Sequence, residues 1–136
     1  MQGLLPGREN ERTGVVVLIA DDSPHSRELL RTVLENDGYA VVEYPNGKDA
    51  FAGAQQHKPD LMLLDLKMPG KDGSEVVSDI RASPDLAHVP VVALTASAMK
   101  GDRERILSAG FTEYLSKPVH VSDLRRIVAQ LTDRKN

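Results

Sequence analysis

Five short apolar runs, separated by longer segments, constrain the fold of this chain more than any other feature of its sequence. They span residues 15–20, 40–43, 61–64, 91–94 and 112–115. The first run reads VVVLIA and lacks polar alternation, as expected for a parallel strand that helices cover on both faces. Strands that alternate with helix-sized segments are typical of an α/β fold built on a parallel sheet.

The segments between these runs carry helix signals. Ser23 and Pro24 supply a cap and a first-turn proline for a helix that ends near Gly38, and Asn46 can cap the next helix. Ser122 is expected to cap the last helix. The sequence therefore predicts five β/α units. Apolar residues at helical spacing mark the five inward faces: Leu29, Leu30, Val33 and Leu34; Ala50, Phe51 and Ala54; Val76, Val77 and Ile80; Ile106 and Leu107; and Leu124, Ile127, Val128 and Leu131.

Length and composition fit one domain, because 136 residues with 40% apolar content can build a single core. We expect the domain to span residues 14–132 and to end in a polar tail, residues 133–136. Residues 1–13 are polar, contain Pro6 and Gly7 and show no periodicity. These features predict a flexible N-terminal leader.

Charge and composition argue against several classes of protein. The net charge is −3 with both signs mixed along the chain, whereas a nucleic-acid binder needs a concentrated basic face. The sequence has no cysteine, which excludes disulfides and fits a cytoplasmic location. No stretch of it approaches the roughly 20 apolar residues that span a bilayer, so we expect no membrane association.

Polar residues follow four of the five runs. Asp21 and Asp22 follow the first run, Asp65 the third and Thr95 the fourth, and Lys117 lies just after the fifth. In an open parallel sheet, ligands bind at the carboxyl ends of the strands. We therefore expect three carboxylates, a hydroxyl and an ammonium group to meet at one edge of the sheet.

The chemistry of this set favours phosphoryl transfer. Three neighbouring carboxylates repel one another, and a single lysine cannot neutralise them all. Oxygen ligands without histidine or cysteine favour a hard cation such as Mg²⁺, which also binds phosphate oxygens. A carboxylate can then attack in line while the metal, Lys117 and Thr95 bind the phosphoryl oxygens. Each residue taken alone could be a turn former, a helix cap or a solvated lysine, and it is their coincidence that favours a functional site.

Four segments of the sequence resemble the receiver domain of bacterial two-component response regulators. They are IADDSPHSR, LMLLDLKMPGKDG, VVALTASAM and EYLSKP, in the family's order and with its approximate spacing over about residues 14–132. The resemblance implies a doubly wound (βα)5, flavodoxin-like fold with a five-stranded parallel sheet of order 2-1-3-4-5. It also implies a signalling switch that a sensor histidine kinase or a histidine phosphotransfer protein phosphorylates. Such a switch is not an enzyme for other substrates, because it catalyses only its own phosphorylation and dephosphorylation.

The resemblance implies a role for each residue of the predicted acidic site. Asp65 matches the phosphoacceptor. Asp22, Asp65 and the backbone carbonyl of Lys67 match the protein ligands of Mg²⁺, and Asp21 matches the carboxylate that reaches the metal through water.

The resemblance also implies a switch and an output face. Thr95 matches the hydroxyl that moves onto the phosphoryl group, Lys117 the cation that pairs with it, and Tyr114 an aromatic rotamer switch. The peptide bond before Pro118 is expected to be cis. The face formed by the fourth helix, fifth strand and fifth helix is expected to bind a downstream protein, and the chain is expected to be a monomer or a weak homodimer.

Other interpretations stay open at this point. The segment DLAHVPVVALTASAMKGDRERI is similar both to stand-alone cell-division regulators and to hybrid-kinase receivers. We expect a single-domain response regulator that binds a partner or relays the phosphoryl group. A receiver excised from a hybrid kinase or longer regulator is the main alternative. An aspartate-dependent phosphatase is disfavoured because Lys67 stands where its second aspartate is expected. A nucleotide-binding module is disfavoured because DDSPHS replaces a glycine-rich loop. A non-phosphorylated interaction domain does not explain the complete acceptor site.

Overall fold

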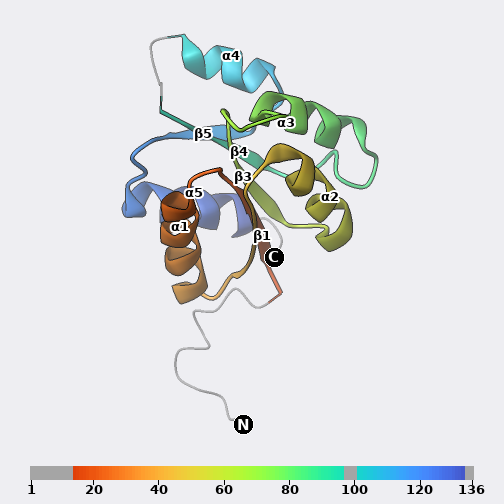
Figure 1. The fold of residues 1–136 in the computed structure, drawn as a ribbon. Helices are drawn as coiled ribbons and strands as arrows, with labels where there is room; N and C mark the ends of the chain where they lie inside the picture. Colours follow the sequence, from red (N-terminus) through yellow and green to blue (C-terminus); the bar gives the residue numbers. More distant parts are fainter. Residues whose placement is uncertain (1–13, 97–100, 134–136) are drawn as a thin grey trace.

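The computed structural model describes residues 14–96 and 101–133, in which five strands alternate with five helices (Figure 1). The expected leader, residues 1–13, and residues 134–136 of the expected tail lie outside the described residues. No helix in the described part of the chain is long and apolar enough to cross a membrane. In chain order the elements are β1 (Val16–Ala20), α1 (Pro24–Asn36), β2 (Ala40–Tyr44), α2 (Gly47–His57), β3 (Leu61–Asp65), α3 (Gly73–Ala82), β4 (Val91–Thr95), α4 (Asp102–Ser108), β5 (Glu113–Ser116) and α5 (Val121–Thr132).

The five strands form one parallel sheet in the order β2-β1-β3-β4-β5. This order confirms the doubly wound fold that the sequence resemblance implies. Strand β1 pairs with both β2 and β3, so the strand order reverses direction at β1. In doubly wound folds this reversal opens a crevice at the carboxyl ends of the strands.

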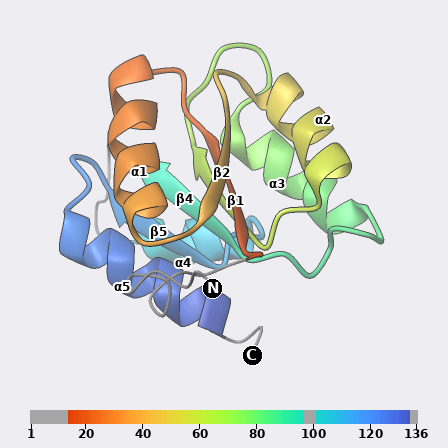
Figure 2. The same cartoon turned by 90° about the horizontal axis from the view of Figure 1, so that it is seen from below.

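Helices cover both faces of the sheet: α1 and α5 lie on one side, and α2, α3 and α4 on the other (Figure 1 and Figure 2). Side chains of a strand alternate between the two faces. Leu18 and Ala20 of β1 therefore join the cluster under α2, α3 and α4, whereas Val17 and Ile19 join the cluster under α1 and α5. This double coverage explains why the strand runs are apolar throughout.

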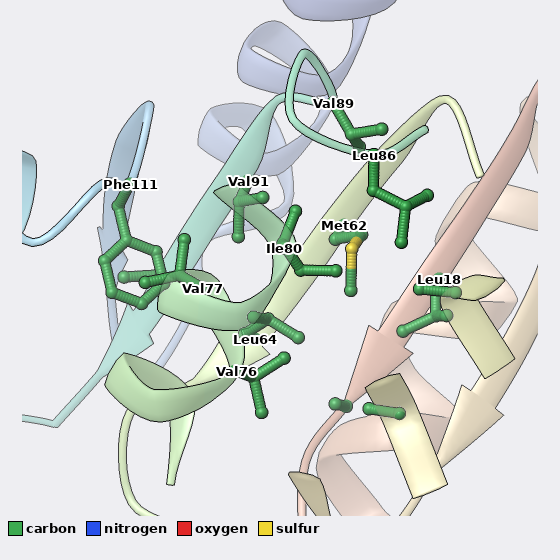
Figure 3. Close-up of a cluster of buried hydrophobic side chains, with 14 of the residues drawn as sticks. Leu18, Met62, Leu64, Val76, Val77, Ile80, Leu86, Val89, Val91 and Phe111 are labelled. Carbon is green, nitrogen blue, oxygen red and sulfur yellow. The ribbon is translucent and has the colours of Figure 1, made fainter. Parts of the chain in front are cut away.

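Helix α3 shows how tightly the sheet is covered. Its Val76, Val77 and Ile80 are fully buried and pack over the sheet, where Met62 and Leu64 are fully buried too (Figure 3). Each side chain of this size contributes about 1.5–3 kcal/mol when it is removed from water. The sheet is therefore a rigid platform for the groups at its strand ends.

Two of the expected helix caps are confirmed. The Ser23 hydroxyl accepts a hydrogen bond from the Ser26 N–H at 3.2 Å, and α1 has Pro24 in its first turn. The Asn46 side chain accepts from the Asp49 N–H at 2.8 Å. These bonds fix the first turns of α1 and α2, which both begin near the carboxyl ends of the strands.

Two sequence predictions about helices are wrong. Helix α5 begins at Val121, with His120 in extended conformation (φ −83°, ψ 134°) as its N-cap residue and no side-chain cap hydrogen bond within the described residues. Ser122 thus lies inside the first turn, where the backbone is already helical and the cap geometry is lost. Leu29 was predicted on the inward face of α1, but its side chain is 42% exposed beside the buried Leu30.

Candidate functional site

The strand register brings Asp21 and Asp65 together. Ala20 is paired with Leu64 across β1 and β3, so the next residue of each chain segment lies at the same level of the sheet. The sequence predicts Asp65 just beyond its strand, whereas in the structure it is the last residue of β3. Pairing of Asp65 with Leu94 of β4 fixes its backbone on the other side.

The same register joins Thr95 to Lys117. Thr95 is the last residue of β4, is buried, and pairs with Ser116 of β5. The Lys117 N–H donates a hydrogen bond to the Thr95 carbonyl at 2.8 Å. The peptide bond between Lys117 and Pro118 is cis, as the resemblance implies.

Three carboxylates form a compact cluster at this edge of the sheet. One carboxylate oxygen from each of Asp21, Asp22 and Asp65 lies within 4.8 Å of the other two. Asp21 is fully buried and Asp65 is 7% exposed, whereas Asp22 is open to solvent. Protein therefore surrounds two of the carboxylates, and the third faces the side from which a ligand can enter.

Lys117 is shared between the two buried carboxylates. Its Nζ donates a hydrogen bond to Asp65 Oδ2 at 3.0 Å and lies 2.8 Å from Asp21 Oδ2. The second contact is an ion pair, and no hydrogen bond to Asp21 Oδ2 is found within the described residues. A buried carboxylate oxygen is thus left without a hydrogen bond, which is costly unless another charge satisfies it.

This donor set fits a hard divalent cation. The cluster offers carboxylate oxygens, one of which is buried without a hydrogen bond, and Lys117 supplies one positive charge against three negative ones. Mg²⁺ and Ca²⁺ take oxygen ligands of this kind. Asp21, Asp22 and Asp65 are the residues of the cluster that could hold such an ion.

Burial and charge shift the pKa values of both members of the Asp65–Lys117 pair. Burial raises the pKa of the Asp65 carboxyl, and the hydrogen bonds from Lys117 and from the Lys67 N–H offset only part of that rise. Burial on its own would lower the pKa of the Lys117 ammonium, but its contacts with Asp21 and Asp65 outweigh burial and raise it. Lys117 therefore stays protonated, and Asp65 binds a proton more readily than an ordinary aspartate.

The remaining predicted residues occupy distinct places. The Lys67 N–H donates to Asp65 Oδ1 at 3.0 Å, while its side chain is exposed. Tyr114 is half-buried in β5 and packs against the core cluster under α2, α3 and α4. It also lines a hollow of about 350 Å³ together with Arg103 of α4 and Asp123 of α5. The predicted residues thus divide into a cluster at the strand ends and Tyr114 on the α4–β5–α5 side.

One contact with the cluster was missed from the sequence. Arg27 of α1 donates a hydrogen bond to the backbone carbonyl of Asp21 at 2.7 Å. The only available signal was its place in the segment DDSPHSR, four residues after the cap residue Ser23. That spacing puts Arg27 one helical turn beyond the cap but does not predict which way its side chain reaches.

A family model and a curated relative both match this chain and point to the same protein family. The family model described as response regulator receiver domain matches residues 17–129. The polar-differentiation response regulator DivK of Brucella anthropi is 41% identical over 105 residues, which cover 77% of this chain and 85% of the relative. The span of the family model includes all of the strand-end residues described above.

Solved structures extend the similarity to the fold. The receiver domain of sensor histidine kinase PA1611 from Pseudomonas aeruginosa, described with a magnesium ion coordinated in its active-site cleft, has a TM-score of 0.82 at 34% identity. It covers 89% of this chain and 99% of its own. The chemotaxis response regulator CheY4 of Vibrio cholerae has a TM-score of 0.82 at 28% identity, and covers 88% of this chain and 99% of its own.

Proposed function

The chain belongs to the response regulator receiver domain family, and from that premise we propose that Asp65 is the residue that accepts the phosphoryl group in two-component signalling. The observation that carries this proposal is the position of Asp65. It is a buried carboxylate at a strand end, in contact with Lys117 and within 4.8 Å of two further carboxylates. Asp21 also contacts Lys117 but its side chain is fully buried, whereas that of Asp65 is 9% exposed, so Asp65 is the lysine-bound carboxylate that a donor can reach.

The residues around Asp65 suit an in-line attack on phosphorus. An oxygen of Asp65 forms the new bond to phosphorus while the bond between phosphorus and the donor breaks, and the donor leaves with that electron pair. Lys117 Nζ, already at Asp65 Oδ2, can pair with a phosphoryl oxygen without moving far. The Lys67 N–H holds Asp65 Oδ1, and we assign the Thr95 hydroxyl to another phosphoryl oxygen.

We propose that Mg²⁺ is the cation of this site. Asp22, Asp65 and the backbone carbonyl of Lys67 would hold it, with Asp21 reaching it through water. When bound, Mg²⁺ supplies positive charge that offsets the carboxylates and the phosphoryl oxygens. Support comes from the buried Asp21 Oδ2, which has an ion pair with the shared Lys117 but no hydrogen bond within the described residues, and from the magnesium ion described for the receiver of PA1611.

We further propose the partners and the output face. A sensor histidine kinase or a phosphotransfer protein would supply the phosphoryl group, in the cytoplasm, and the chain would act as a monomer or weak homodimer. The hollow that Tyr114 lines between α4, β5 and α5 supports that face as the surface for a downstream protein. The similarity to DivK, of which the match covers 85%, supports a single-domain regulator. The same chemistry would operate in a receiver that belongs to a hybrid kinase, an alternative with which the similarity to the PA1611 receiver is consistent.

The test is intact-protein mass spectrometry after incubation with Mg²⁺ and acetyl phosphate. Wild type is expected to gain one phosphoryl adduct, and Asp65→Asn is expected to gain none. Asp85→Asn is the matched control, because it makes the same chemical change at an exposed side chain that pairs with Lys58. An adduct on Asp65→Asn would show that another residue is the acceptor.

A further inference from the structure

Arg27 bridges the acidic cluster and the edge strand of the sheet. Its Nη1 donates a hydrogen bond to the Asp21 carbonyl at 2.7 Å, and its Nε donates to Glu43 Oε1 of β2 at 3.0 Å. The side chain of Arg27 is 17% exposed and that of Glu43 is 27% exposed. A guanidinium group suits this position because its planar fork can reach two acceptors at once.

Hydrogen bonds hold three of the four polar atoms of Asp21. Its N–H donates to the Tyr44 carbonyl at 3.2 Å, its Oδ1 accepts from the Ser23 N–H at 2.9 Å, and its carbonyl accepts from Arg27. The remaining atom, Oδ2, faces Lys117 and has no hydrogen bond within the described residues. The restraints therefore leave a single buried oxygen directed at the site.

Glu43 anchors Arg27 through one of its two carboxylate oxygens and binds Arg31 through the other. Its two carboxylate oxygens accept from Arg27 and from Arg31, both on α1. The next residue of β2, Tyr44, carries the carbonyl that binds the Asp21 N–H. Helix α1 and strand β2 thus hold the Asp21–Asp22 turn through adjacent positions of one strand. Arg31 shares Glu43 but has no described contact with that turn.

We propose that Arg27, oriented by Glu43, is a positioning residue that sets the divalent-cation affinity of the acidic cluster. It fixes the backbone of Asp21, and thereby the direction of Asp21 Oδ2 and the place of the neighbouring Asp22 carboxylate. The inference rests on the proposed function only in requiring that the cluster binds Mg²⁺. Partners that orient metal ligands from outside typically change metal affinity by about 10- to 100-fold when they are removed.

The test is isothermal titration calorimetry of the full chain with MgCl₂. Arg27→Gln is expected to weaken Mg²⁺ binding by about tenfold, as for other groups that orient metal ligands. Glu43→Gln is expected to weaken Mg²⁺ binding by less, because Arg27 then keeps its bond to Asp21 and has an uncharged amide oxygen in place of the carboxylate as its anchor. Arg31→Gln is the matched control and should bind Mg²⁺ as wild type does. Thermal unfolding identifies a temperature at which every variant is folded, and the titrations are run there.

Three results would overturn the inference. Equal Mg²⁺ affinity in wild type, Arg27→Gln and Glu43→Gln would remove the positioning role while leaving the proposed metal site intact. Wild-type affinity in Arg27→Lys, which keeps the charge but not the two-armed geometry, would show that charge alone matters. Absence of Mg²⁺ binding by wild type would overturn the proposed metal site together with the inference. Glu43→Gln provides the answer if Arg27→Gln does not fold.

Discussion

Lys117 contacts two buried carboxylates at once, at 2.8 Å from Asp21 Oδ2 and 3.0 Å from Asp65 Oδ2. One positive charge cannot neutralise both, and Asp21 raises the pKa of Asp65 in addition to the larger effect of burial. With both carboxylates ionised, their repulsion and the burial of Asp65 therefore contribute unfavourable electrostatic free energy to the folded protein. That energy is what a divalent cation, or a change of Asp65 to a neutral side chain, can release.

The first prediction concerns Asp65→Asn in the absence of Mg²⁺. Because the pKa of Asp65 is raised in the folded protein, the folded state binds a proton more tightly than the unfolded chain does. The favourable contribution is complete below the ordinary aspartate pKa and is lost as pH rises through the raised folded value. At neutral pH Asp65→Asn should therefore unfold at a higher temperature than wild type.

Thermal unfolding in EDTA over a pH series checks this prediction. The difference between Asp65→Asn and wild type should shrink as the pH is lowered through the folded pKa of Asp65, because wild-type Asp65 then becomes neutral as well. Asp85→Asn, at an exposed position, should show no such trend. A variant that is less stable than wild type at neutral pH would show that the Lys117 hydrogen bond outweighs burial.

The second prediction concerns Lys117→Gln. Removing the lysine ammonium leaves two buried carboxylates without a positive charge beside them. We expect the free energy of unfolding to fall by about 2 kcal/mol, less than for a fully buried pair because Lys117 is partly exposed. Its side chain is 23% exposed. Urea denaturation in EDTA measures the loss, and added Mg²⁺ should recover part of it.

Lys58→Gln is the control for Lys117→Gln. Lys58 pairs with Asp85 at 3.6 Å, and both side chains are more than half exposed. Such a pair contributes about 0–1 kcal/mol, so the control should differ little from wild type. Equal losses in the two variants would contradict the special role of the shared lysine.

At the scale of the elements, helix starts divide into those that the sequence predicts and those that it does not. Ser23 and Asn46 act as caps because each directly precedes its helix and accepts an N–H. Ser122 has the right side chain but lies inside α5. Whether a serine acts as an N-cap depends on its backbone angles. Here those angles depend on the path of the chain from Lys117 into α5, and no short sequence pattern predicts that path.

Helix α3 has a cap that was overlooked although the sequence contains its signal. The Asp72 side chain accepts from the Glu75 N–H, and the Glu75 side chain accepts from the Asp72 N–H, each at 3.0 Å. An acceptor followed three residues later by glutamate is the capping-box pattern. This cap holds the start of α3 just after the loop that carries Lys67.

The third prediction compares these two helix starts. Asp72→Ala should lower the free energy of unfolding by about 1 kcal/mol, because it removes the capping box of α3. Ser122→Ala should be close to neutral, since no cap hydrogen bond to Ser122 exists in the described structure of α5. Urea denaturation of both variants measures the difference. A larger loss in Ser122→Ala than in Asp72→Ala would contradict the assigned start of α5.

At the scale of the whole molecule, topology explains why so much of the site was predictable. Parallel strands bring their carboxyl ends to one edge, so Asp21, Asp65 and Lys117 could be brought together from the order of apolar runs alone. Arg27 could not be placed in this way, because its contacts depend on how α1 lies against β2.

Arg81 shows the same limit away from the site. It is a partly buried cation of α3 whose guanidinium group donates to the carbonyls of Gly110, Ala87 and Val89, at 2.6–3.0 Å. No ion pair between Arg81 and a carboxylate occurs within the described residues, and burial lowers its pKa. It ties α3 to the turns before β4 and β5. In the sequence Arg81 looks like an ordinary surface arginine, because its acceptors are backbone carbonyls, which every residue has and which no residue type identifies.

The last prediction concerns the expected start of the domain at residue 14. The start of β1 is held by groups within the described chain: the Val16 N–H donates to Asp60 Oδ2 at 2.8 Å, and the Val15 carbonyl accepts from the Ala40 N–H at 3.0 Å. We therefore expect deletion of residues 1–13 to leave the melting temperature and phosphorylation by acetyl phosphate unchanged. Asp60→Ala in the full chain is the contrasting variant and should lower the melting temperature, because Val16 loses its acceptor. A lower melting temperature after the deletion would mean that residues 1–13 contribute to folding and that the domain begins before residue 14.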